Sequence, residues 1–164
     1  METIKKELNQ AILLRKEGNL KESNEILVKL ASENPEDAEI NFQCAWSFDT
    51  LGNETEAVPY YEKAISLGLE GEDLEGALLG LGSTYRTLGQ YEKSKSTFLK
   101  GMELFPNNRA IQVFYSMTLY NLNEHHQAMD ILLKNLVETT NDQEITSYRK
   151  AIEFYSDKLD TIWE

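Results

Sequence analysis

Residues 75–108 read EGALLGLGSTYRTLGQYEKSKSTFLKGMELFPNN, and this stretch decides the fold. It contains two runs of periodically spaced apolar residues, with Gly89 between them and Pro106 after the second. Glycine after a helix favours a left-handed turn, and proline cannot continue a helix. The stretch therefore predicts one compact unit that consists of a helix, a tight turn and a second helix.

The same turn signal recurs along the chain. Gly18, Gly52, Gly89 and Asn123 follow one another at a nearly constant period of about 34 residues, with three more in the middle interval. Asparagine tolerates the left-handed conformation better than most residues do, so Asn123 preserves the pattern. The three additional residues fall in the segment 68–73, where we expect a longer loop. Four two-helix repeats follow, over about residues 4–37, 38–74, 75–108 and 109–142.

Asparagine and aspartate mark the predicted helix starts. We expect Asp37, Asn108 and Asp142 to cap the first helices of successive units. We expect Asn19 and Asn53 to cap second helices, because each has a glutamate three places further on, which is a capping-box pattern.

Residues 143–163 continue without a further turn signal. Apolar residues at helical spacing form one stripe here: Ile145, Tyr148, Ile152, Tyr155, Leu159 and Ile162. The last unit of a repeat array has to cover an apolar face. We therefore predict a single terminal helix over 143–163 that caps the fourth repeat, and one domain over residues 1–164.

The third repeat carries a resemblance to the tetratricopeptide repeat family. That family has a bulky residue, Leu-Gly, Tyr, Gly-x-Tyr, Ala, a bulky aromatic, Ala and Pro at fixed places in each repeat. The matching residues are Leu78, Leu81, Gly82, Tyr85, Gly89, Tyr91, Phe98 and Pro106. Ser94 and Gly101 stand where the family has alanine, which should weaken this repeat without shifting its register. Glycine costs about 1 kcal/mol relative to alanine inside a helix, so Gly82 should mark a close approach of a neighbouring helix.

The other repeats match the same pattern in part, and the resemblance covers nearly the whole chain. Residues 57–89 also resemble a group of small bacterial proteins with this repeat. The resemblance implies an all-α fold, a right-handed superhelical solenoid whose first helices line a concave groove. It also implies a protein–protein interaction scaffold, because such grooves hold extended peptides or helices of partner proteins.

Register predicts which side chains line the groove, because residues one and two turns apart on a helix share a face. The predicted groove residues are Phe42, Trp46, Asp49, Leu79, Ser83, Arg86, Val113, Met117 and Tyr120. Family members that bind acidic C-terminal peptides place several basic residues there, whereas Arg86 is the only one in this set. We expect Arg86 to pair with Asp49 on the adjacent first helix.

Two alternatives remain open at this stage. The protein's own terminal helix could fill the groove. The chain could also be a self-associating structural module, a homodimer formed through the groove or through the aromatic tail Phe154, Tyr155, Ile162 and Trp163.

Charge restricts the class of partner. The formal net charge is −12, and no cluster of lysine and arginine exceeds two adjacent residues, so nucleic acid and anionic membranes are not expected partners. Residues 38–74 alone carry eight acids and one lysine, which favours a basic partner surface. The single cysteine, Cys44, fits a reducing compartment. A charged N-terminus and the lack of a long apolar run indicate a cytoplasmic protein.

No catalytic or metal-binding pattern is present in the sequence. His125 and His126 are adjacent, so they diverge on a helix, and no Asp, Glu or Cys stands at a chelating spacing with both. The P-loop, GxSxG, HExxH and dinucleotide-binding fingerprints do not occur. We expect neither enzymatic activity nor a cofactor nor a metal.

Overall fold

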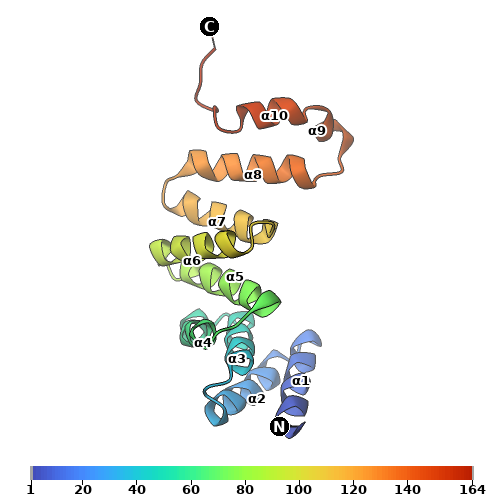
Figure 1. Cartoon of the computed structure of the whole chain (residues 1–164), viewed down its shortest axis with the longest axis vertical. Helices are drawn as coiled ribbons and strands as arrows, with labels where there is room; N and C mark the ends of the chain where they lie inside the picture. Colours follow the sequence, from blue (N-terminus) through green and yellow to red (C-terminus); the bar gives the residue numbers. More distant parts are fainter. Residues whose placement is uncertain (1, 164) are drawn as a thin grey trace.

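The protein is a stack of helices that follow one another along a single long axis (Figure 1). The computed structural model describes residues 2–163, and in this range the chain forms ten helices and no strand. They are α1 Glu2–Lys16, α2 Leu20–Glu33, α3 Ala38–Thr50, α4 Glu54–Ser66, α5 Gly71–Thr87, α6 Tyr91–Leu104, α7 Arg109–Asn121, α8 His125–Thr139, α9 Gln143–Ser147 and α10 Arg149–Tyr155. The predicted all-helical solenoid is confirmed.

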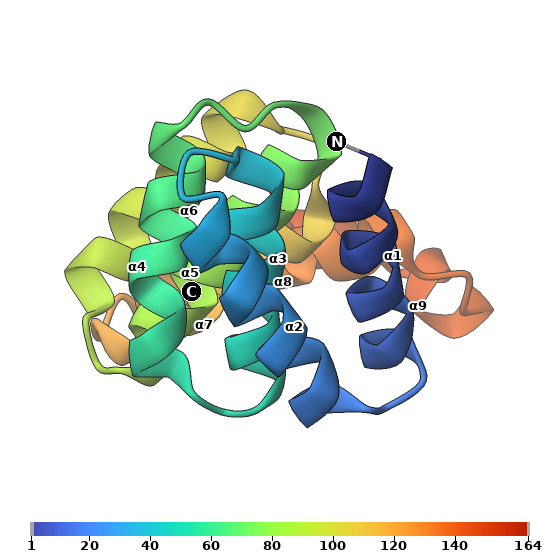
Figure 2. The same cartoon turned by 90° about the horizontal axis from the view of Figure 1, so that it is seen from below.

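Each helix from α1 to α7 packs against the next helix in the chain. The first helices of neighbouring pairs also touch one another, α1 with α3, α3 with α5 and α5 with α7. Seen along the long axis, successive pairs are turned relative to one another (Figure 2). The contacts among the first helices place them on the inner side of the stack, where a groove is expected.

All four predicted turn residues have a positive φ. The angles are 88° at Gly18, 75° at Gly52, 73° at Gly89 and 61° at Asn123. Asn123 is the one non-glycine residue with positive φ in the described part of the chain. The turn positions read from the sequence are therefore confirmed.

The three additional residues between the second and third turns lengthen a helix, not the loop. Helix α5 has 17 residues, whereas α3 and α7 have 13 each. It begins at Gly71, so half of the segment 68–73 is helical. The expected longer loop is wrong, because the insertion adds about one turn to the start of α5.

The capping predictions hold for first helices and fail for second helices. The Asp37, Asn108 and Asp142 side chains accept hydrogen bonds from the backbone N–H three residues on, at 2.9, 2.9 and 3.0 Å. Asn19 and Asn53 precede α2 and α4 but make no side-chain cap bond, so the predicted capping boxes are wrong. Their ψ angles are 60° and 63°, outside the extended region from which an Asx side chain reaches the first turn.

Glycine and serine let α5 and α6 approach closely. A Cβ added at Gly82 would lie 2.6 Å from the fully buried Phe98 ring, so the predicted close approach is confirmed. The Ser94 hydroxyl donates to the Gly82 carbonyl at 2.7 Å and lies 2.8 Å from the Thr118 hydroxyl. Ser94 therefore links three helices, where the family's alanine would link none.

The predicted single helix over 143–163 is wrong. The chain breaks at Tyr148 into α9 and α10, and α10 ends at Tyr155. Figure 1 shows α10 running back over α8, against which it packs. Neither α9 nor α10 contains a buried residue, and Leu159 and Ile162 lie exposed beyond the last helix. The break lets the segment fold back over α8, but it covers this end of the stack incompletely.

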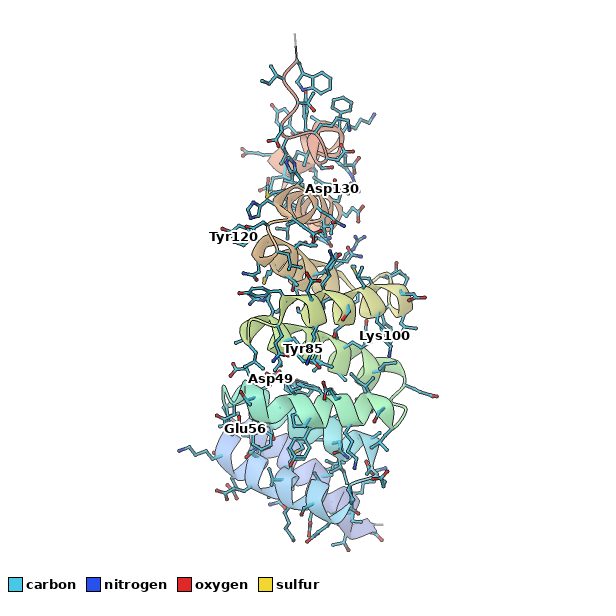
Figure 3. All side chains as sticks on the ribbon, turned by 90° about the vertical axis from the view of Figure 1, so that its left-hand side faces the viewer. Asp49, Glu56, Tyr85, Lys100, Tyr120 and Asp130 are labelled. Atoms are coloured by element: carbon cyan, nitrogen blue, oxygen red, sulfur yellow. The ribbon has the colours of Figure 1, made fainter. Side chains whose placement is uncertain are left out.

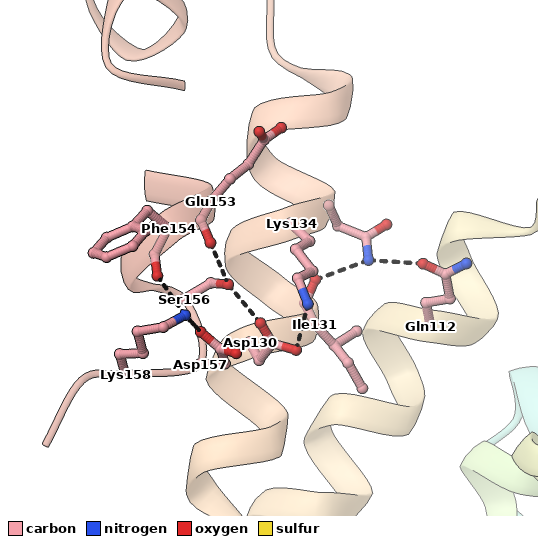
Figure 4. A network of polar contacts seen from close by, with 10 residues as sticks. Gln112, Asp130, Ile131, Lys134, Glu153, Phe154, Ser156, Asp157 and Lys158 are labelled. Atoms are coloured by element: carbon pink, nitrogen blue, oxygen red, sulfur yellow. Dashed lines mark hydrogen bonds and ion pairs between the residues drawn. The ribbon is translucent and has the colours of Figure 1, made fainter. Parts of the chain in front are cut away.

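A hydrogen bond from Ser156, just after α10, ties this end of the chain to Asp130 of α8 (Figure 4). The Ser156 hydroxyl donates to Asp130 Oδ1 at 2.5 Å, and Lys134 Nζ lies 2.8 Å from Asp130 Oδ2. Burial alone would raise the pKa of Asp130, but the bonds from Lys134 and Ser156 bring it below its ordinary value. Ser156 is also the one buried residue after α10 in the described chain.

Candidate functional site

Five of the predicted groove residues line one pocket on the first-helix face. We call it the central pocket; its volume is about 320 Å³. It is bordered by Phe42, Trp46, Asp49, Tyr61, Gly76, Leu79, Gly80, Ser83 and Phe114. These residues come from α3, α4, α5 and α7, so two adjacent repeats and the start of a third build one cavity.

Aromatic rings form the walls of the central pocket. Phe42 and Trp46 stack with ring centroids 5.8 Å apart, and Phe42 lies 6.3 Å from Tyr61. Phe42 and Tyr61 are buried, whereas Trp46 is 44% exposed. A Cβ added at Gly80 would lie 2.6 Å from Tyr61 Cζ, so the absence of a side chain there admits the tyrosine ring. The pocket has a packed inner wall and one accessible indole.

Asp49 supplies the carboxylate of the central pocket. Tyr61 donates its hydroxyl to Asp49 Oδ2 and Thr84 donates to Oδ1, each at 2.9 Å. Burial raises the pKa of Asp49 above its ordinary value, and the two hydrogen bonds oppose this only in part. The expected pair between Asp49 and Arg86 is wrong, because neutral hydroxyls satisfy the carboxylate instead.

Arg86 lies in a second cavity further along the stack, with Met117 and Tyr120. We call it the upper pocket; its volume is about 470 Å³. Its lining consists of Arg86, Ser116, Met117, Tyr120, Asn121, His125, Ala128, Met129 and Leu132. Figure 3 shows Asp49 and Tyr120 on the same side of the stack. Val113, the ninth predicted residue, lines neither pocket.

The upper pocket combines a guanidinium with apolar side chains. Arg86 Nη1 donates to Asn121 Oδ1 at 3.4 Å, and the buried Arg86 Nε has no hydrogen-bond partner among the described residues. The His125 ring lies 4.8 Å from the Tyr120 ring. The sequence indicated no metal-binding role for His125, and the structure places it at the border of this pocket.

Arg15 is a site residue that sequence reasoning missed. Its guanidinium lies 4.1 Å from the centre of the Trp46 ring and donates to Gln43 O at 3.2 Å and to Gln43 Oε1 at 2.5 Å. Burial lowers the pKa of Arg15. Arg15 stands one full repeat before Asp49, so the same register applied to the first repeat would have found it. It fixes the indole from the side of α1.

The terminal segment does not fill the groove. Helix α10 packs on α8, and no residue of 143–163 lines the central or the upper pocket. The alternative that the protein's own end occupies the groove is therefore wrong for the described chain.

The two histidines stand apart from any metal-like cluster. His126 Nε2 lies 2.5 Å from Asp160 Oδ2, and among residues 2–163 no three His, Cys, Asp or Glu side chains gather as metal ligands do. Cys44 is buried, which raises the pKa of its thiol to about 12. None of the helices described combines the length and the apolarity that crossing a membrane requires.

Paired helices stacked around an inner face with open aromatic pockets define an α-helical repeat protein, an architecture that presents an extended binding surface. Residues 38–159 match the family described as Tetratrico peptide repeat, and the chain belongs to this family. Members of the family are in general non-catalytic modules for protein–protein interaction.

Solved structures show the same fold at low sequence identity. A fragment of MamA from Desulfovibrio magneticus is 14% identical with a TM-score of 0.76, over 98% of this chain and 89% of that one. PilF from Pseudomonas aeruginosa is 17% identical with a TM-score of 0.70, over 93% and 68%. A tetratricopeptide repeat protein from Parabacteroides merdae is 18% identical with a TM-score of 0.72, over 90% and 57%.

A curated relative is Superkiller protein 3 of Saccharomyces cerevisiae. The identity is 27% over 105 residues, which is 60% of this chain. The chain spans only 7% of the length of the yeast protein. The likeness therefore concerns the repeat, not the whole yeast protein.

Proposed function

We propose that the chain is a non-catalytic adaptor that binds a peptide or a helix of a partner protein along its first-helix face. The observation that carries this proposal is Trp46. Its ring is 44% exposed at the central pocket, yet Phe42 stacks on it and Arg15 lies over it. A large aromatic side chain that is already fixed loses little conformational entropy on binding, which is typical of an interface anchor.

The arrangement of the two pockets supports an extended ligand. Residues of α5 and α7 border both pockets, so one segment lying along these helices would contact both. Tryptophan, tyrosine, methionine and arginine are enriched in protein interfaces, and Trp46, Tyr120, Met117 and Arg86 all lie here. A cytoplasmic location is part of the proposal, supported by the single, buried cysteine.

Peptide display against the immobilised protein tests this function. Peptides selected on the wild type should bind Trp46→Ala about 30-fold more weakly, which corresponds to the roughly 2 kcal/mol of an interface hot spot. The matched control is Leu99→Ala, because Leu99 is 45% exposed on the second helix α6 and lines neither pocket. Selected peptides that bind Trp46→Ala and Arg86→Ala as tightly as the wild type would contradict the proposal.

A second candidate function, self-association, rests on the C-terminal end of the stack. Tyr148 is 68% exposed, Tyr155 47% and Trp163 56%, and α8, α9 and α10 enclose an apolar groove of about 770 Å³. Contiguous exposed apolar surface of this kind often marks an interface. Light scattering should then give the mass of a dimer for the wild type and of a monomer for a Tyr155→Ser, Trp163→Ser variant. A wild type that is monomeric at all concentrations would contradict self-association, and the adaptor would remain as the only proposed function.

A further inference from the structure

The composition of the central pocket is unusual for a purely apolar binding site. Four aromatic residues line it, Phe42, Trp46, Tyr61 and Phe114, and a single carboxylate, Asp49, lies among them. A ligand that fills this pocket with apolar atoms alone would bury the carboxylate further without compensating its charge. Such burial is unfavourable.

We propose that the central pocket binds a cationic side chain of the partner, a lysine whose ammonium group contacts Asp49. The inference rests on the proposed function, because it names the residue that anchors a peptide in the same groove.

Asp49 has the hydrogen bonds that it needs but no opposite charge. Its two oxygens accept from Tyr61 and Thr84, which are neutral donors. None of the ion pairs in the described part of the chain includes Asp49. Burial accordingly raises the pKa of this carboxyl group. A ligand cation would supply the favourable charge interaction that the free protein lacks.

The walls of the pocket suit the aliphatic part of lysine. Phe42 stacks on the Trp46 ring and the Arg15 guanidinium lies over it, so part of the ring surface is already engaged. The remaining aromatic surface, together with Leu79, is apolar and can pack against the four methylenes of a lysine. Long basic side chains bury their stems in this way while the charged group reaches a polar partner.

The hydrogen bonds already present favour lysine over arginine. Each oxygen of Asp49 already accepts one hydroxyl donor, and a planar guanidinium would need the remaining acceptor sites of both oxygens in one plane for a bidentate contact. An ammonium group is compact and has three freely oriented donors. One such donor suffices for a contact with Asp49, and the hydroxyl of Ser83 borders the same pocket.

The surrounding charge would attract such a ligand. Residues 38–74 carry eight acids and one lysine. At the other end of α3, burial and then the neighbouring Asp73 and Asp37 raise the pKa of Glu39, so acidic groups also meet at the start of this helix. This net negative charge raises the association rate of a basic peptide, whereas Arg15 contributes the opposite charge beside Trp46.

The test uses a synthetic peptide chosen by display on the wild type. The selected peptides should share a lysine. Replacing this lysine with acetyl-lysine should weaken binding to the wild type about tenfold, and replacing it with arginine should weaken binding by a smaller factor than acetyl-lysine does. For Asp49→Asn, the lysine and acetyl-lysine peptides should bind within about twofold of each other. Glu56→Gln is the matched control, since it removes one acidic charge from the exposed surface of α4 and should behave as the wild type (Figure 3).

Failure of this inference is distinguishable from failure of the proposed function. Peptides that depend on Trp46 but bind Asp49→Asn and the wild type equally would overturn the lysine site and leave the groove function intact. Tighter binding of the arginine peptide would overturn the choice of lysine. If no selected peptide depends on Trp46 or Arg86, both the function and the lysine site fall. Circular dichroism of Asp49→Asn, expected to match the wild type, ensures that lost binding reflects the pocket.

Discussion

At the residue scale, the buried charge of Asp49 destabilises the fold, whereas the proposed contact with a lysine needs this charge. Burial raises its pKa in the folded protein above the value of about 3.9 that aspartate has in an unfolded chain. Between these two values the folded state binds more protons than the unfolded state, so stability falls as pH rises through this window. Above the folded pKa the full cost of the buried charge is present.

The first prediction concerns the stability of Asp49→Asn. We expect this variant to unfold at a higher urea concentration than the wild type at pH 7. The asparagine amide has no charge to desolvate, and its oxygen can still accept a hydrogen bond from a hydroxyl. The difference should shrink as the pH is lowered toward 4. Glu56→Gln, exposed on α4, should show no such gain. An Asp49→Asn protein less stable than the wild type at pH 7 would mean that the bonds from Tyr61 and Thr84 outweigh desolvation.

The second prediction concerns the contact between Gly82 and Phe98. Gly82→Ala should lower the free energy of unfolding by about 1–3 kcal/mol, since overpacking a buried ring outweighs the better helix propensity of alanine. Chemical denaturation measures the change. Thr87→Ala, an exposed site on the same helix, should stay within about 0.5 kcal/mol of the wild type. Equal stability of Gly82→Ala and the wild type would show that Phe98 can move aside.

At the scale of the elements, first and second helices begin in different ways. The first helices α3 and α7 follow extended residues whose side chains reach the first turn, whereas the second helices α2 and α4 follow a left-handed turn that sets a different approach. Asp37→Ala should therefore lower stability by about 1 kcal/mol. Asn53→Ala, which removes the same kind of side chain at the start of α4, should cost less than about 0.5 kcal/mol. Equal losses in urea unfolding would contradict this difference.

Most of the elements could be predicted from the sequence because their signals are local. A positive φ favours glycine and asparagine, so the turns could be predicted at Gly18, Gly52, Gly89 and Asn123. The break at Tyr148 could not be predicted, since residues 143–163 contain neither glycine nor proline. It depends on how the segment packs against α8, which is a tertiary contact.

The candidate site, too, could be predicted from the sequence only in part. The register of the repeat brought Phe42, Trp46 and Asp49 to one face, and the structure places them in one pocket. Register gives the face on which a side chain lies, but not which polar groups meet. Arg86 and Asp49 are at equivalent places on adjacent helices, yet each bonds to other partners. Tyr61, which comes from a second helix, also lay outside a scheme based on first helices.

At the scale of the whole molecule, residues 2–163 contain three core clusters along the stack. Each cluster is built mainly by neighbouring helices, so stability is a sum of local units and their interfaces. The units differ at the C-terminal end, where α9 and α10 contribute no buried residue.

Removing residues 143–164 tests the contribution of this end. The truncation takes away α10 and the bond from Ser156 to Asp130, and it uncovers the outer side of α8. We expect a lower melting temperature, measured by circular dichroism, because the outer side of α8 loses its cover. A shorter truncation of residues 159–164 keeps α10 and Ser156 and should lower the melting temperature less than the longer truncation does. Unchanged melting after the longer truncation would mean that the segment is a free arm.

Because packing is uneven along the stack, the backbone amides of different helices should exchange with deuterium in a definite order. Backbone amides exchange with deuterium when their hydrogen bonds open, and short helices held by few apolar contacts open with the smallest free energy. Amides of α9 and α10 should exchange first, those of α8 next, and those of α3 to α6, which surround Tyr61 and Phe98, last. Mass spectrometry after brief labelling would record this sequence. The chain should thus open from its C-terminal end while the helices that carry the central pocket remain closed.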